Sequence, residues 1–291
     1  MKLIVCSIIS LGCLTLFGCD PSIKKNVLNE NHDIENKKDN SYLVQQGEKY
    51  YKGINVQQDY NKAFDYFLKA ARNSDPIAQN MVASYYMNGL GKIKQDHKIT
   101  FEWYKKSAEL GSLTAIYNLG IAYFNGIGVE KDKDKATELF KIAAKQNMPE
   151  ALNQLATQYM NGDVVGKNLK KSFEFNMLSA EKKYPQAMND VGLAYQLGSG
   201  VKKDTLKATE WFIKASNLGN TDAYFNLAVK YESGDGIEKN QDKAISFYQL
   251  SADHGKNEAV EILIEIYSDQ NSNLYNKSKV LKLENFLKIG R

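Results

Sequence analysis

Tyrosine recurs along the chain at a nearly constant spacing. Successive members of the series are separated by 36 residues, with a single step of 37. A fixed period of this length is typical of stacked helical repeats, in which each repeat is a helix pair of roughly 34 to 47 residues. The series consists of Tyr50, Tyr86, Tyr123, Tyr159, Tyr195, Tyr231 and Tyr267.

Each tyrosine belongs to a helical pattern of positions that we expect to be buried. Eight residues before each of the last six tyrosines stands an alanine, and four residues before it stands a leucine or valine. These three positions fall on one face of a helix and predict a single packed stripe. The alanines are Ala78, Ala115, Ala151, Ala187, Ala223 and Ala259, and the aliphatic residues are Val82, Leu119, Leu155, Val191, Leu227 and Leu263.

Small residues flank the first six tyrosines on both sides. Three residues before each tyrosine stands glycine or alanine, which lets a neighbouring helix approach closely. Three residues after it stands glycine, which favours the left-handed turn that ends many helices. A second helix is predicted beyond each turn, marked by aromatic pairs such as Tyr66-Phe67 and Trp211-Phe212 and then by small pairs such as Ala143-Ala144. The pattern predicts an all-α chain.

Two of these units carry a family resemblance. The segment from Ala115 to Val129, continuing through Asp132 to Ala143-Ala144, resembles the Sel1-like repeat, a relative of the tetratricopeptide repeat. The unit from Ala187 to Leu218 resembles it equally well. The resemblance covers residues 42–267 and implies an α-solenoid of about six helix-turn-helix repeats plus the first helix of a seventh. It implies binding or scaffolding of other proteins and no reaction.

The departures from the repeat occur at its ends and in its fourth unit. Tyr42 and Gln46 replace the buried alanine and leucine of the first helix, as expected for a terminal repeat with one solvated face. Within residues 268–291 a helix over 277–289 is predicted to cap the other end with Val280, Leu283, Phe286 and Leu287. In the fourth repeat the loop reads Gly162-Asp-Val-Val-Gly166, Ser172 replaces an alanine and Asn176 replaces an aromatic residue. Either the sequence of this repeat has diverged without an effect on function, or the repeat contacts a partner.

The first eighteen residues differ from the rest of the chain. Lys2 is followed by an apolar run from Leu3 to Phe17, which is shorter than the roughly 20 residues that span a bilayer and predicts a signal peptide over 1–18. The run ends in Leu16-Phe17-Gly18-Cys19, which resembles the lipobox of bacterial lipoproteins and implies lipidation of Cys19. Residues 19–41 predict a flexible tether. Asp20 resembles a signal for retention in the inner membrane, so we expect a lipid-anchored protein that faces the periplasm.

Composition and motif searches give no support for catalysis. The 38 basic and 34 acidic residues leave a net charge of +4 without the concentrated basic stripe that nucleic-acid binding favours. All three cysteines lie within the first nineteen residues. The histidines, His32, His97 and His254, show no metal-ligand spacing, and the chain has neither a nucleophile elbow nor a phosphate-binding loop. We therefore expect no enzymatic activity, no cofactor and no small-molecule substrate.

A polar series suggests where a partner would bind. Three residues after the first alanine of successive repeats, on the face opposite the packed stripe, polar side chains recur, and others follow near the helix ends. Side-chain amides both donate and accept hydrogen bonds and so suit an extended peptide backbone. The alternative is that asparagine is merely common at this point of the repeat. The predicted contact residues are Asn118, Gln154, Asp190, Asn226, Asn125 and Asn161, with Asp163 from the altered loop.

The resemblance leaves two functions open. Some lipoproteins with Sel1-like repeats resemble this chain in layout and serve as periplasmic immunity proteins against secreted effectors. Other solenoid lipoproteins organise polysaccharide or signalling assemblies of the envelope. Both readings predict a protein partner, and they differ in which protein it is.

Overall fold

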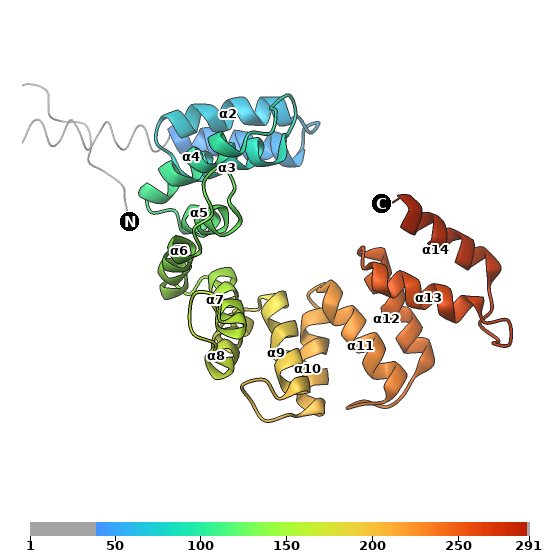
Figure 1. The fold of residues 1–291 in the computed structure, drawn as a ribbon. Coiled ribbons are helices and arrows are strands. Elements are labelled where there is room, and N and C mark those ends of the chain that lie inside the picture. Colours follow the sequence, from blue (N-terminus) through green and yellow to red (C-terminus); the bar gives the residue numbers. More distant parts are fainter. Residues whose placement is uncertain (1–38, 290–291) are drawn as a thin grey trace, which may run out of the picture.

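The computed structural model describes residues 39–289, which form a stack of antiparallel helix pairs. The stack curves into a single arc, with α5 and α7 on its inner side and α6 and α8 on its outer side (Figure 1). A helix at residues 39–52 comes first. It is followed by α2 (Tyr60–Arg72), α3 (Pro76–Asn88), α4 (His97–Glu109), α5 (Leu113–Asn125), α6 (Lys133–Lys145), α7 (Pro149–Asn161), α8 (Leu169–Glu181), α9 (Pro185–Leu197), α10 (Thr205–Ser216), α11 (Thr221–Ser233), α12 (Gln241–Asp253), α13 (Asn257–Ser268) and α14 (Lys277–Ile289).

Local sequence sets both ends of these helices. The second helix of each repeat begins after an aspartate or asparagine whose side chain accepts the backbone N–H three residues later, as Asp132 accepts from Lys135 at 2.9 Å. Each first helix from α3 to α11 ends at a glycine with positive φ, such as Gly126 at 77°. Non-glycine residues adopt this conformation at a cost, which explains the glycine predicted there.

The predicted stripe is buried at its alanine and aliphatic positions, whereas most of the tyrosines are only half-buried. Ala151 and Leu155 are enclosed, and Tyr159 lies at the edge of the core. The Tyr159 ring stacks on Phe175 with centroids 5.6 Å apart, and the Lys171 ammonium lies over it at 5.3 Å. A tyrosine at the core edge buries its ring and leaves its hydroxyl near water, so full burial was the wrong expectation. Tyr267 is the exception, since it is buried against α14.

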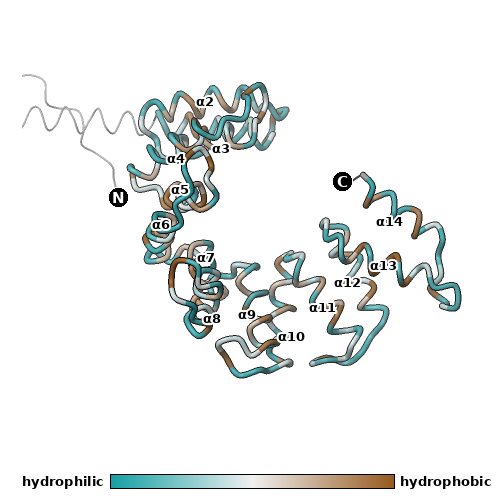
Figure 2. Tube along the Cα trace, in the orientation of Figure 1, coloured by the Kyte–Doolittle hydropathy of each residue, from teal (hydrophilic) through white to brown (hydrophobic). Residues whose placement is uncertain are grey.

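Aromatic residues of the second helices fill the space beside the small residues of the first helices. A Cβ placed on Gly120 would lie 2.7 Å from the Phe140 ring, and the same relation holds for Gly47 with Phe67. Hydrophobic residues recur along every helix and do not gather in one segment of the chain (Figure 2). Each helix pair contributes one layer to a continuous core.

The two ends of the stack largely follow the sequence prediction. The first helix begins at residue 39, inside the predicted tether, and Asn40 donates to the Asn73 carbonyl at 3.2 Å. Tyr42 is exposed, as expected for a terminal repeat. In α14, Val280, Leu283 and Leu287 pack on the terminal core cluster as predicted. Phe286 is exposed, so its assignment to the packed face was wrong.

Candidate functional site

The predicted polar series lies at the junctions between repeats. The sequence predicted that its first-helix members would be exposed, but in the structure all four are half-buried: Asn118, Gln154, Asp190 and Asn226. Asn118 Nδ2 donates to Asn80 Oδ1 at 3.0 Å, and Asn226 Nδ2 donates to Asn189 Oδ1 at 2.8 Å. The first helices pack closely enough for these short side chains to meet, and each of the two amides makes one hydrogen bond between repeats. The predicted ladder is therefore partly engaged within the stack, and its contact with a partner stays a prediction.

The remaining predicted contact residues lie apart from this series. Asn125, Asn161 and Asp163 are exposed. Asp163 accepts from the Lys133 ammonium at 2.8 Å, an ion pair whose two side chains are both partly solvated. Such pairs contribute little to stability. The exposure of Asn125, Asn161 and Asp163 is compatible with partner contact and does not by itself indicate it.

Two departures from the repeat meet at the junction of the fourth and fifth repeats. Asn176 of α8 occupies the position that holds Phe67, Tyr104, Phe140, Phe212 or Tyr248 in the other second helices. Asp190 of α9 is the one ionisable residue in its series, whose other members are Gln45, Met81, Asn118, Gln154, Asn226 and Ile262. Asn153 joins the two, because its Nδ2 lies 2.8 Å from Asn176 Oδ1 and 2.7 Å from Asp190 Oδ2.

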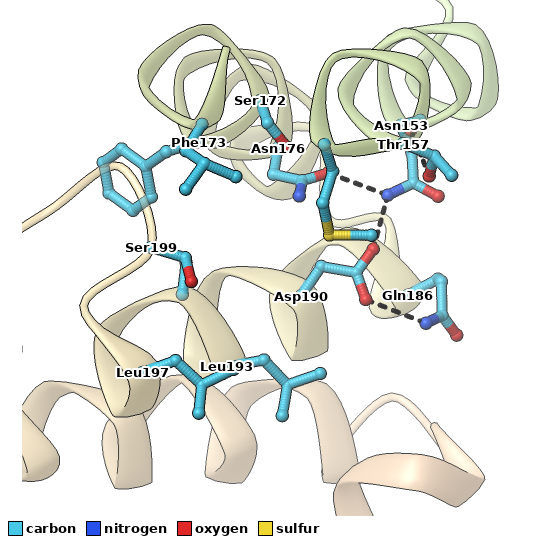
Figure 3. A pocket seen from close by; sticks show the side chains of 13 residues that line it. Asn153, Thr157, Ser172, Phe173, Asn176, Gln186, Asp190, Leu193, Leu197 and Ser199 are labelled. Carbon is cyan, nitrogen blue, oxygen red and sulfur yellow. Dashed lines mark hydrogen bonds between the residues drawn. The ribbon is translucent and has the colours of Figure 1, made fainter. Parts of the chain in front are cut away.

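The missing aromatic ring coincides with a pocket of about 300 Å³ between α7, α8 and α9, which we call the α7–α9 pocket (Figure 3). Buried Ser172 and Asn176 line it from α8. One part of its wall is polar and includes Asn153, Gln186 and Asp190. The other part is apolar and is formed by Met160, Leu169, Phe173, Leu193 and Leu197. Met160 and Leu197 are also strongly exposed, at 47% and 70%, so the apolar wall continues onto the surface.

Asp190 is the charged group of the α7–α9 pocket. Gln186 Nε2 donates to its Oδ1 at 3.0 Å, and Asn153 donates to Oδ2 (Figure 3). Burial raises the pKa of this carboxyl, the neighbouring amides oppose the rise and Asp222 adds to it. Within residues 39–289 no basic side chain forms an ion pair with Asp190.

An adjoining hollow continues from Asp190 toward α11 and α13. It is lined by Asp222, Lys256 and Glu258, among others, and it shares Gln186, Asp190 and Leu193 with the α7–α9 pocket. Lys256 Nζ lies 2.7 Å from Asp222 Oδ1, so the one lysine of this lining already has a carboxylate partner. The joint surface therefore carries an excess of negative charge.

The described part of the chain contains no group of three or more side chains suited to holding a metal ion. His97 begins α4, and His254 caps the end of α12. None of the helices in this part is both long and apolar enough to cross a bilayer.

Comparison with known proteins identifies the repeat. A Sel1 repeat model matches residues 47–75, 76–112, 113–148, 149–175, 185–220 and 221–256. The chain belongs to the Sel1 repeat family. The match to the fourth repeat stops at residue 175, one residue before Asn176, and Sel1 similarity resumes at 185 in the fifth. The unmatched residues 176–184 therefore include Asn176 of the α7–α9 pocket.

Solved structures of Sel1 proteins share this fold, although no curated protein matches the chain. A Sel1 repeat protein from Oxalobacter formigenes is 29% identical over 85% of this chain and all of its own, with a TM-score of 0.76. A protective antigen of uropathogenic Escherichia coli is 27% identical over 87% of this chain and 54% of its own, with a TM-score of 0.63. An immunity protein from Pseudomonas aeruginosa is 23% identical over 74% and 81% of the two chains, with a TM-score of 0.53, a likeness of fold alone.

Sequence reasoning singled out Asp190 and the fourth repeat but missed several pocket residues. Met160, Leu193 and Leu197 were not predicted, although each is an apolar residue outside the packed stripe. Asn153 was also missed, because its role depends on the next repeat. Aligning the second helices would have placed Asn176 opposite Ala156 of α7, but the connection to Asp190 runs through Asn153 and needs the structure.

Proposed function

We propose that this Sel1 repeat protein is a non-catalytic lipoprotein of the bacterial cell envelope that binds a protein partner through the α7–α9 pocket and its rim. The exposed aliphatic rim around a partly polar pocket carries the proposal. Met160, Leu169 and Leu197 surround a recess whose polar groups are already positioned by hydrogen bonds. Protein interfaces derive most of their affinity from such desolvated pockets with an apolar surround.

Site-specific photo-crosslinking tests this surface. A photoreactive phenylalanine derivative at Leu197, which is 70% exposed, should capture the partner in cells. The matched control is Leu206 on α10, which is 65% exposed and does not line the α7–α9 pocket. Capture at Leu206 but not at Leu197 would place the interface elsewhere on the solenoid.

The partner we favour is a secreted effector that this protein neutralises in the periplasm. The fold is shared with Pseudomonas aeruginosa proteins described as immunity proteins, at 21 to 23% identity for two of them. Mass spectrometry of the cross-linked species identifies the partner, and its production in the periplasm should kill cells unless this protein is present. A captured polysaccharide-synthesis or sensor protein, with no toxicity, would support the alternative of an envelope scaffold.

The membrane anchor is a separate part of the proposal and lies outside the described residues. The lipobox-like Leu16 to Cys19 motif supports lipidation of Cys19, and Asp20 favours the inner membrane. Cys19→Ala should abolish metabolic labelling with a fatty-acid analogue and release the protein from membranes. Labelling that persists in the variant would refute the anchor without affecting the binding surface.

A further inference from the structure

The α7–α9 pocket borders a substitution that removes bulk from the core. In the first, third and fifth repeats a phenylalanine of the second helix contacts a glycine, as Phe140 contacts Gly120. Asn176 is shorter than any of these rings, and the pocket of about 300 Å³ lies beside it. Well-packed cores rarely keep a void larger than a water molecule, so an unfilled recess of this size is suited to a ligand group.

Asp190 makes the polar part of the pocket suited to a hydrogen-bond donor. Asn153 Nδ2 donates to both Asn176 Oδ1 and Asp190 Oδ2, and Gln186 Nε2 donates to Asp190 Oδ1. An ionised carboxylate offers about four lone-pair sites, so Asp190 retains acceptor capacity after these two bonds. No described basic side chain lies within ion-pair distance of Asp190, because Lys256 of the adjoining hollow pairs with Asp222, and Asp222 disfavours the ionisation of Asp190. A cation would relieve this unfavourable charge.

The apolar part of the pocket requires that this cation have an apolar stem. Leu193 and Leu197 follow Asp190 along α9, and Phe173 lines the pocket from α8 (Figure 3). A bare metal ion finds no other ligand set here, since the described residues hold no metal-binding cluster. Arginine matches the recess better than lysine does. Its guanidinium is weakly hydrated, stacks on aromatic rings and binds carboxylates through a planar pair of donors.

We propose that the α7–α9 pocket receives one arginine side chain of the partner protein, with the guanidinium against Asp190 and the stem against Leu193 and Leu197. This inference rests on the proposed function, because it takes the partner to be a protein. It adds the chemistry by which that partner is recognised. The arginine supplies the cationic partner that Asp190 lacks among residues 39–289.

The test uses N-acetyl-arginine methylamide as a probe for an arginine within a polypeptide. The full chain, labelled with ¹⁵N and held in detergent, is titrated while the side-chain amide signals of Asn153 and Gln186 are followed by NMR. Saturable shifts are expected with this probe. N-acetyl-citrulline methylamide, which has nearly the same shape without the charge, should bind at least about tenfold more weakly, as expected for losing a charge-assisted hydrogen bond. The N-acetyl-lysine methylamide probe should also bind more weakly.

Two variants connect the shifts to the pocket. Asp190→Asn should weaken the arginine probe by about tenfold or more. It should keep the fold, because asparagine occupies the same position in Asn118 and Asn226. Asn176→Tyr should fill the recess and abolish probe binding. Tyrosine is the suitable replacement because Ala156 stands where Ala83 and Ala228 accompany Tyr104 and Tyr248.

Several outcomes would overturn the assignment. These are absence of shifts with the arginine probe, equal binding of the citrulline or lysine probe, and undiminished binding to Asp190→Asn. The test does not involve the natural partner. A failed titration together with cross-linking at Leu197 would therefore reject the arginine site and retain the proposed function. Saturable probe binding without cross-linking at Leu197 would retain the arginine site and reject the proposed partner-binding surface.

Discussion

Leu155→Ala tests the core that underlies every other inference. Leu155 is 3% exposed and belongs to a buried cluster with Phe140, Ala143 and Leu152. The substitution removes three carbon atoms, which at about 0.8 kcal/mol each corresponds to roughly 2.4 kcal/mol of lost transfer free energy. The cavity that remains brings the expected loss to about 3–5 kcal/mol. Urea unfolding followed by far-UV circular dichroism measures it as a lower midpoint at an unchanged slope.

Leu178→Ala is the matched control, because it makes the same chemical change in the same repeat. Leu178 is 47% exposed, so its removal forfeits only part of the transfer term and leaves no closed cavity. The expected loss is below about 1 kcal/mol. Equal midpoints for the two variants would mean that Leu155 does not face the interior. The helix register, and with it the position of Asp190, would then be wrong.

Two further variants test the packing and the electrostatics of the stack. Gly120→Ala should lower the urea midpoint, because a new Cβ would lie 2.7 Å from the buried Phe140 ring. Overpacking of this kind costs about 1–3 kcal/mol, which outweighs the roughly 1 kcal/mol gained in helix propensity. A stabilised variant would contradict the contact. Asp190→Asn should stabilise the chain increasingly as the pH rises from about 3.5 toward 7. The sign follows because burial and Asp222 raise the folded-state pKa of Asp190 above its ordinary value, so its ionisation favours unfolding over that range. A stability difference that stayed constant with pH would refute this cause.

Most of the fold could be predicted from the sequence because the repeat samples each position several times. Ala151 or Leu155 alone would indicate little, but six residues of the same kind at one offset indicate a shared environment. The same reasoning failed for Tyr159. Its recurrence indicates a shared environment at the core edge, and recurrence alone does not distinguish edge from interior.

The candidate site was harder to predict because it depends on contacts between repeats. An offset along one helix gives the side of that helix on which Asp190 lies, but not what faces it from α8. Asn153, Asn176 and Asp190 are separated by 23 and 37 residues in their two hydrogen bonds. The sequence accordingly predicted an exposed polar series where the structure has a half-buried one, and its contact with a partner stays a prediction.

The arrangement at the junction of the fourth and fifth repeats favours binding over a purely structural role. A solenoid distributes its stability over many interfaces, so the loss of one ring at Asn176 weakens a single junction and leaves the other layers intact. Asn153 Nδ2 donates to Asn176 Oδ1, and this bond helps to order the polar part of the pocket when it is empty. Asp190 is held by amides on both sides, and a partner would meet a carboxylate whose position is already fixed. Such preorganisation lowers the entropic cost of association, because few side chains must be immobilised at contact.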